Sequence, residues 1–184
     1  MYKRHQLGSG AGEILASIAG AHSVRGGQIV DMSTGKSFLP KSSKAAIDHG
    51  IAYCSPDRKH DGLFLGRPIS ENLTSPNLKR ISNTGILNTS KSDKLSMDIA
   101  KAFTIDPSRL PHEASVLSGG NQQKVALGKW LSINPGLMLV DEPTRGVDVG
   151  ARAEIYQELV ELAESGVSII VASTDLLEIA ELPS

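Results

Sequence analysis

Residues 137–142, which read Leu-Met-Leu-Val-Asp-Glu, constrain the fold of this chain more than any other stretch. Four apolar residues that end in two adjacent carboxylates are typical of a buried parallel strand whose carboxyl end opens on a ligand crevice. At such a position Asp141 can hold a magnesium ion, and Glu142 can orient or deprotonate an attacking water. A plain strand followed by two solvated acids is the alternative interpretation.

A glycine pair lies at the start of the helix that precedes this strand. Residues 117–124 read Leu-Ser-Gly-Gly-Asn-Gln-Gln-Lys and lead into a helical run. The first N–H groups of a helix have no partner within the helix, and its dipole is positive there, so residues 118–120 can bind an anion. Glycine also lets a phosphate approach the backbone closely. Taken alone, Ser-Gly-Gly is equally typical of a loop.

In this order and spacing, the motifs resemble those of the ATP-binding cassette (ABC) family. Residues 137–142 resemble its Walker B strand, and residues 146–148, which end in Asp148, resemble its D-loop. Residues 121–124, 129–131 and 141–151 are similar to the second, C-terminal cassette of bacterial import ATPases for ribose, galactose, xylose and similar sugars. The signature motif corresponds to Ser118, Gly119, Gly120, Asn121 and Gln122.

The resemblance implies an α/β fold. It predicts a P-loop NTPase-like cassette with a mainly parallel sheet and a helical insert, truncated at both ends. Residues 1–63 would form a partial nucleotide-binding core and residues 64–116 the insert that leads to the signature. Residues 117–184 would hold the signature helix, the Walker B strand, the D-loop and the last core strand. Because the family's early strands would precede residue 1, a fragment or a truncated relative is expected.

A degenerate phosphate loop is expected near the start of the chain. The working motif G-x-x-x-x-G-K-[ST] needs glycines for a backbone cradle, a lysine for the phosphates and a hydroxyl for magnesium. Alignment by resemblance places His5 at the first glycine, Ala11 at the lysine and Gly12 at the hydroxyl residue. The loop would consist of Gly8, Ser9, Gly10, Ala11 and Gly12. A glycine-rich turn that enters a helix is the alternative.

Two more positions depart from the family's hydrolytic site. Pro56 occupies the Glu or Gln position of the Q-loop, and its side chain can neither bind magnesium nor position a water. Thr174 occupies the position of the histidine that senses the γ-phosphate; a hydroxyl can donate one hydrogen bond but carries no imidazolium charge. Residues 57–59, Asp-Arg-Lys, match the family, with a solvated charged turn as the alternative.

Apolar periodicity and glycine positions predict the other elements. Leu95, Ile99 and Phe103 form the apolar stripe of a helix within residues 91–104, and residues 81–92 are expected to form an exposed loop. Further helices are predicted at 14–20, 44–50 and 151–165, and strands at 28–32, 51–54 and 167–172.

Charge and hydropathy exclude several classes of function. A net charge of −1 over 184 residues provides no overall electrostatic footprint for nucleic acid, with a localised patch as the alternative. No apolar run approaches the ~18 residues that span a bilayer, and the first ten residues lack the apolar core of a secretory signal. The resemblance therefore implies a cytoplasmic protein, peripheral on the inner face of the cell membrane.

The resemblance also implies ATP and Mg²⁺ as ligands and a second cassette as partner, in the same polypeptide or as a homodimer. Cassettes work in pairs, and each ATP lies between the phosphate loop of one and the signature of the other. We expect this chain to donate an intact signature, to keep Glu142 as its one catalytic candidate, and to be inactive alone. Transmembrane permease subunits and, indirectly, an extracellular or periplasmic sugar-binding protein complete the expected importer. A non-catalytic scaffold or regulatory cassette and a soluble non-transport ABC ATPase are the alternatives.

Overall fold

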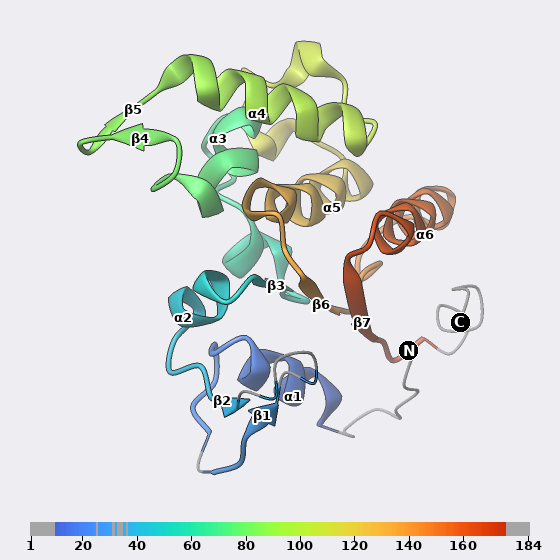
Figure 1. Cartoon of the computed structure of the whole chain (residues 1–184). Coiled ribbons are helices and arrows are strands. Elements are labelled where there is room, and N and C mark those ends of the chain that lie inside the picture. The colour runs from blue at the N-terminus through green and yellow to red at the C-terminus, as the bar shows by residue number, and fades with distance from the viewer. Residues whose placement is uncertain (1–9, 25, 31, 33–34, 36, 176–184) are drawn as a thin grey trace.

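A parallel sheet lies between two layers of helices in the computed structural model of the chain (Figure 1). The structure describes residues 10–24, 26–30, 32, 35 and 37–175. Within these residues the sheet has the order β3 (Ile51–Cys54), β6 (Leu137–Asp141), β7 (Ser168–Ala172). The central strand β6 pairs with β3 from Ile51↔Leu137 to Cys54↔Val140, and with β7 from Leu137↔Ser168 to Asp141↔Ala172. The predicted α/β class with parallel pairing is confirmed.

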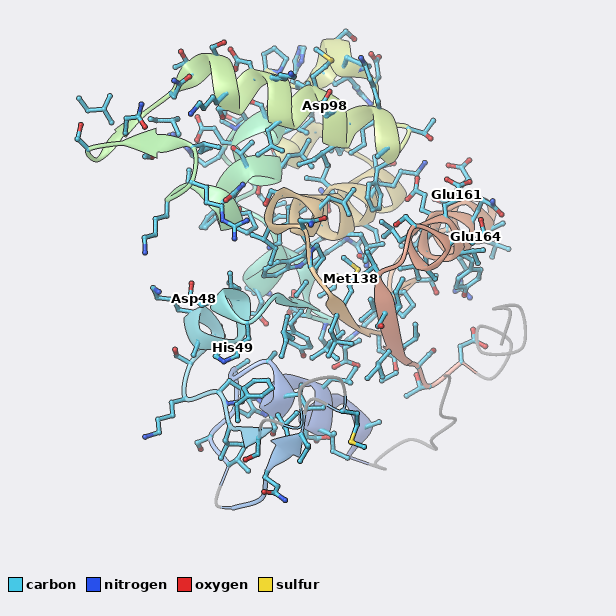
Figure 2. All side chains as sticks on the ribbon, in the orientation of Figure 1. Asp48, His49, Asp98, Met138, Glu161 and Glu164 are labelled. Atoms are coloured by element: carbon cyan, nitrogen blue, oxygen red, sulfur yellow. The ribbon has the colours of Figure 1, made fainter. Side chains whose placement is uncertain are left out.

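The two faces of the sheet carry separate apolar clusters. Side chains alternate along a strand, so Ile51 and Leu139 face the layer of α1 (Ala11–Ile18) and α2 (Ser43–Asp48). Met138 and Val140 face the opposite layer, which contains α5 (Gly119–Gly128) and α6 (Val149–Glu164). Met138 lies deep inside the molecule, whereas Asp98, Glu161 and Glu164 lie on its outer surface (Figure 2). The near-continuous apolar composition of β6 follows from burial on both faces.

Residues 64–116 form a helical region stacked on α5 (Figure 1). It contains α3 (Ile69–Thr74), α4 (Thr89–Ala102) and three 3₁₀ turns, η2 (Ser75–Asn77), η3 (Pro107–Arg109) and η4 (Ala114–Val116). The predicted stripe is confirmed: Ile99 and Phe103 are buried, and Leu95 packs against the same cluster. The three-segment division of the chain stays a prediction.

The segment predicted as the loop 81–92 contains a β-hairpin, so the loop prediction is wrong in part. Strand β4 (Ser82–Asn83) pairs antiparallel with β5 (Ile86–Leu87), and α4 follows at once. Thr84 and Gly85 between the strands have φ angles of 50° and 85°. Two consecutive residues with positive φ match the right-handed twist of a tight hairpin.

Several predicted elements begin or end elsewhere. Strand β1 (Ile29–Val30) pairs with β2 (Ser37–Phe38), so the strand predicted at 28–32 is shorter within the described residues. Helix α1 begins at Ala11 rather than residue 14, and α6 begins at Val149 because Asp148 caps it by accepting a 3.0 Å hydrogen bond from the Ala151 N–H. The predicted glycine helix ends are confirmed by left-handed φ angles at Gly20 (65°), Gly50 (74°) and Gly166 (100°).

Two short helical segments join these layers. Segment η1 (Arg58–Gly62) is a π-helical turn that follows β3, and η5 (Lys129–Ile133) is a 3₁₀ continuation of α5. Segment η1 directly follows the carboxyl end of β3, and Lys129 at the start of η5 donates to the Gly62 carbonyl at the end of η1. Segment η1 therefore borders the edge of the sheet where a ligand site is expected.

Candidate functional site

The carboxyl ends of β3, β6 and β7 bring the expected site residues to one edge of the sheet. Asp141 ends β6 and Glu142 follows it, Pro56 follows β3, and Thr174 follows β7. Because parallel strands share this edge, residues up to about 120 positions apart in sequence become neighbours. The resemblance assigned these four residues to motifs of one site, and the structure places all four at this edge.

Asp141 is the buried acid of this edge. Its exposed fraction is 8%, and Tyr53 of β3 donates a hydrogen bond of 3.4 Å from its hydroxyl to Asp141 Oδ2. Burial, followed by the nearby charge of Glu142, raises the pKa of Asp141. Burial and the neighbouring Asp141 carboxylate raise the pKa of Tyr53. Asp141 is thus held in place, in a setting that disfavours its charge.

Glu142 is fixed by its backbone and by β7. It has a left-handed backbone, with φ of 53°, which costs a non-glycine residue about 1–2 kcal/mol. Its N–H donates to the Ala172 carbonyl at 2.8 Å, and its Oε1 accepts a hydrogen bond of 2.7 Å from the Thr174 N–H. The carboxylate predicted as a catalytic base therefore already serves as an acceptor for the backbone of the loop where active cassettes carry their histidine.

The start of α1 lies opposite Asp141. Of the predicted phosphate loop, Gly8 and Ser9 lie outside the described residues, Gly10 is the N-cap with φ of 76°, and Ala11 and Gly12 form the first turn. No side chain caps this helix. A Cβ atom at Gly12 would lie 2.7 Å from Asp141 Oδ2. Backbone and carboxylate are therefore nearly in contact where a hydroxyl residue would be needed.

The residues at this edge do not fit a magnesium ion held as in a hydrolytic cassette. Asp141 offers one carboxylate, while Gly12 offers no hydroxyl and Pro56 no side-chain ligand. Among the residues that the structure describes, no group of three or more His, Cys, Asp or Glu side chains could hold a metal ion. These residues do not supply the near-octahedral oxygen coordination that Mg²⁺ requires.

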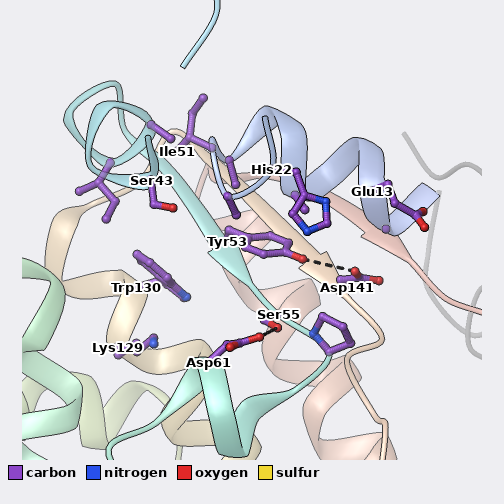
Figure 3. Close-up of a pocket in the computed structure, with 17 residues that line it drawn as sticks. Glu13, His22, Ser43, Ile51, Tyr53, Ser55, Asp61, Lys129, Trp130 and Asp141 are labelled. Atoms are coloured by element: carbon purple, nitrogen blue, oxygen red, sulfur yellow. Dashed lines mark hydrogen bonds between the residues drawn. The ribbon is translucent and has the colours of Figure 1, made fainter. Parts of the chain in front are cut away.

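A cavity of about 780 Å³ borders Asp141, between α1, α2 and β3 (Figure 3). Tyr53, Trp130 and Asp141 line it, together with Lys129 and Asp61. Lys129 is the one lysine or arginine among these described lining residues, and its ammonium donates to the Gly62 carbonyl. Burial lowers the pKa of Lys129. Among the described lining residues, the single lysine or arginine of the cavity is therefore already engaged with a backbone carbonyl.

The second candidate site is the start of α5. Ser118 is its N-cap: the hydroxyl accepts hydrogen bonds from the Asn121 N–H at 3.4 Å and from the Asn121 side-chain amide at 3.1 Å. Ser118 is exposed, and Gly119 and Asn121 are partly exposed. The predicted helix start is confirmed, and these three residues form an accessible rim.

Gly120 and Gln122 face inward instead. A Cβ atom at Gly120 would lie 2.7 Å from the Ala151 Cβ atom of α6, so this glycine is required by helix packing. Gln122 has an exposed fraction of 6%, and its amide donates to the Ala114 and Leu117 carbonyls, both at 3.3 Å. The side chain of Gln122, which the resemblance groups with the signature donated to a partner's ATP, therefore holds the preceding loop and does not reach the surface.

An ion-pair cluster holds α5 against α6. The Lys124 ammonium lies 3.0 Å from Glu158, and both side chains are 7% exposed; it also lies 2.9 Å from the exposed Glu154. Burial raises the pKa of Glu158 to about 7, and Lys124 only partly offsets this. Burial opposes the charge of Lys124, but its hydrogen bonds to Glu154 and Glu158 raise its pKa.

Arg58 is the residue that sequence reasoning undervalued. The alternative of a solvated charged turn is wrong for this residue, because Arg58 is 8% exposed. Its guanidinium donates to the Arg145 carbonyl and, at 3.0 Å, to the Gly146 carbonyl of the predicted D-loop. Asp57 and His60, in contrast, are exposed and pair with each other at 2.8 Å. The match of Asp57-Arg58-Lys59 to a known motif was the available signal.

Comparison with known proteins identifies relatives over nearly the whole chain. The family described as "ABC transporter" matches residues 6–145. A protein named "Ribose import ATP-binding protein RbsA" from Geobacillus kaustophilus is 42% identical over 174 residues, which are 94% of this chain and 35% of that protein. "Ribose import ATP-binding protein RbsA 2" from Escherichia coli O157:H7 is 42% identical over 177 residues, or 94% of this chain and 34% of that protein. The chain spans about a third of the length of these curated relatives.

Solved structures show the same fold. A nucleotide-free ATP-binding cassette from an ABC transporter is similar with a TM-score of 0.75 and 20% identity, over 95% of this chain and 69% of that chain. A dimeric cassette in a post-hydrolysis state, bound to ADP and Pi, is similar with a TM-score of 0.73 and 22% identity, over 93% and 73% of the two chains. Together with the family match, the parallel sheet and the motifs at its edge, these likenesses show that this chain belongs to the ABC transporter family and has the fold of its ATP-binding cassettes.

Proposed function

We propose that this chain is a cassette of a sugar import ATPase that completes the ATP site of a partner cassette and binds ATP weakly at its own site. The ribose import proteins, at 42% identity, support the class of substrate. The partners would be a second cassette, in the same polypeptide or as a homodimer, and the permease subunits, with a sugar-binding protein acting indirectly. The location would be the cytoplasmic face of the cell membrane. The described part of the chain has no helix long and apolar enough to cross that membrane.

The exposed start of α5 carries this proposal. Ser118 and Gly119 present the first N–H groups of a ten-residue helix, which have no acceptors within the helix. These donors and the positive helix end suit a phosphate approaching from outside. Within the described residues, the side-chain hydrogen bonds of this rim run between Ser118 and Asn121.

The edge of the sheet around Asp141, where this chain would bind its own ATP, supports the proposal that this binding is weak. The lysine position is Ala11 and the hydroxyl position is Gly12, while Glu142 is engaged by the Thr174 N–H. Lysine and magnesium supply much of the charge stabilisation in phosphoryl transfer. Their combined loss is expected to remove hydrolysis at this edge, so that turnover would depend on the partner's site.

A pair of substitutions at Ser118 tests whether the start of α5 completes the partner's ATP site. The experiment uses the full-length ATPase assembled with its membrane subunits. Ser118→Asp keeps a good N-cap but places a negative charge beside the partner's ATP, whereas Ser118→Asn keeps the cap without the charge. We expect ATP turnover to fall about a hundredfold or more with Ser118→Asp, and much less with Ser118→Asn. Equal turnover in both variants and the wild type would support the scaffold alternative.

Glu142→Gln tests, in the same assembly, whether this chain's own site hydrolyses ATP. Because Glu142 is already held by a backbone N–H, a glutamine should preserve that contact and leave turnover within about twofold of the wild type. A loss as large as that of Ser118→Asp would show that Glu142 is a working base and that the chain's own site is active. Sugar uptake, measured in parallel, distinguishes an importer from a soluble non-transport ATPase.

A further inference from the structure

Arg58 reaches from the turn after β3 to two loops that are distant in sequence. It is buried in η1, and its guanidinium donates through Nη1 to the Arg145 carbonyl and through Nη2 to the Gly146 carbonyl. Two donors from one planar group fix both the position and the orientation of the residues they bind. The predicted D-loop, at residues 146–148, is therefore tied to the turn at the carboxyl end of β3.

The same guanidinium lies against the start of α5. A Cβ atom at Gly119 would lie 2.9 Å from Arg58 Nη2 and 2.8 Å from the Gly146 carbonyl oxygen. Real Cβ atoms do not approach a backbone oxygen so closely, so only glycine fits at position 119 in this arrangement. The signature rim, the D-loop and η1 thus meet around one side chain.

The turn that carries Arg58 is itself fixed from the other end of α5. The Lys129 ammonium donates to the Gly62 carbonyl, at the last residue of η1. A Cβ atom at Gly62 would lie 3.1 Å from the Arg58 Cβ atom, so the turn is tightly wound. The contact between Lys129 and Gly62 holds η1 at the end of α5. Arg58, which belongs to η1, is therefore held in place where it contacts the D-loop near the start of α5.

We propose that Arg58 is a positioning residue that holds the rim at Ser118–Gly119 at a fixed spacing from the D-loop, and thereby presents the rim to the partner's ATP. The proposal rests on the proposed function, since it concerns the same rim at the start of α5 that would complete the partner's ATP site. A lysine cannot replace the guanidinium fully, because one ammonium lacks the planar pair of donors that matches two neighbouring carbonyls. Arg58 would act through the rim without touching the nucleotide.

The test compares Arg58→Met and Arg58→Lys in the full-length ATPase assembled with its membrane subunits. Arg109→Met is the matched control, because Arg109 is exposed in the helical region. Amide hydrogen exchange is measured at residues 118–121 and 145–148, and kcat and KM for ATP are measured well below each variant's unfolding midpoint. Ser118→Asp is measured alongside.

With Arg58→Met, we expect exchange at both segments to accelerate about tenfold or more and kcat to fall by about tenfold to a hundredfold. KM for ATP should change less than kcat, because the partner's own loop supplies most of the binding. Arg58→Lys should fold even where Arg58→Met does not, and should recover part of kcat. Arg109→Met should match the wild type.

Two results would overturn the proposal. One is unchanged exchange at 118–121 in both Arg58 variants; the other is accelerated exchange with wild-type kcat while Ser118→Asp remains damaging. If Ser118→Asp itself leaves turnover unchanged, the proposed function fails, and the exchange at 118–121 and 145–148 alone decides whether Arg58 positions the rim. A loss of kcat equal to the unfolded fraction of each variant would also contradict a positioning role.

Discussion

Helices α1 and α5 both begin at the edge of the site, but their starts differ in chemistry. Helix α5 is capped by Ser118, whereas α1 begins after Gly10 with no side-chain cap. Both starts have N–H groups without acceptors inside the helix, and the positive dipole end that suits a phosphate. The fold therefore has two helix starts of this geometry, and we propose that only the one at α5 serves a nucleotide.

The difference extends to the surroundings of each start. The first turn of α5 is packed against α6 through Gly120 and lies against Arg58, so its position is set by neighbours on two sides. The first turn of α1 approaches a buried carboxylate, Asp141, through Gly12. A carboxylate in that place repels the phosphates that the helix start would attract. Packing thus fixes the position of the start of α5, whereas electrostatic repulsion disfavours phosphate binding at the start of α1.

The largest expected effect comes from breaking the ion pair that holds α5. Lys124→Met would leave Glu158 of α6 buried against α5 without its cation, and we expect the free energy of unfolding, measured with urea, to fall by about 3–5 kcal/mol. Adding Glu158→Leu should restore most of the loss, because no charge is then left buried. Lys44→Met is the control, since the Lys44–Asp48 pair is exposed, and its midpoint should match the wild type. Equal losses in both lysine variants would contradict the buried role of Lys124.

The same pair predicts a pH dependence of stability. The pKa of Glu158 is about 7 in the folded protein, above its ordinary value of 4.5. The folded state therefore holds a proton that the unfolded chain releases between these values, so unfolding free energy falls as pH rises across this window, by up to about 3 kcal/mol. Glu158→Gln should flatten the slope between pH 4.5 and 7 in chemical unfolding. An unchanged slope would assign the pH dependence to other groups.

Restoring a cation at the start of α1 should reduce its difference from α5. Ala11→Lys places an ammonium where the family's phosphate lysine stands, and a charge-assisted hydrogen bond contributes about 1.5–3 kcal/mol. We therefore expect Mg-ATP affinity, measured by isothermal titration, to rise about tenfold or more, with Ala11→Met as an uncharged control. Adding Gly12→Ser supplies the hydroxyl but moves Asp141. Tight binding by the native chain, with no gain from lysine, would mean that the backbone cradle suffices.

The smallest effect compares one glycine in each helix. Gly120→Ala meets the Ala151 Cβ atom, which cannot move without its helix, so a net loss of about 1–2 kcal/mol is expected after alanine's helix propensity is included. Gly12→Ala meets a carboxylate oxygen of Asp141, which can rotate, so the change should stay within about 0.5 kcal/mol. Thermal and urea unfolding measure both. Equal losses would show that Asp141 is as rigid as α6.

Local sequence patterns predicted the elements whose signals are strong and short in range. The strand ending at Asp141, the helix opened by Ser118 and the apolar stripe of Ile99 and Phe103 all follow from apolar spacing and capping chemistry. The hairpin at 82–87 was missed because Thr84 is an unusual residue for a left-handed turn position. The start of α1 was misplaced because Gly10 caps it through backbone geometry rather than a side chain.

The candidate site likewise contains some residues whose place was predicted from the sequence and others whose role was not. Pattern and resemblance predicted that Asp141, Glu142, Pro56 and Thr174 share one edge, and the parallel sheet places them there. The roles of Gln122 and Arg58 could not be predicted, because their burial depends on Ala114 and Gly146, which come from other segments. Side-chain direction at a loop depends on neighbours that local sequence does not specify.

The sequence by itself determined the order of the three parallel strands, the adjacent acids at 141 and 142, and the alanine at position 11, where the resemblance expects a lysine. These properties depend on residue type and short-range spacing, which chain order alone specifies. Only the tertiary structure decided that Glu142 is occupied by the Thr174 N–H, that Gly12 faces Asp141, and that Arg58 joins the D-loop to the signature rim. Each of these contacts joins residues at least 30 positions apart, so it exists only once the sheet and its helices have packed.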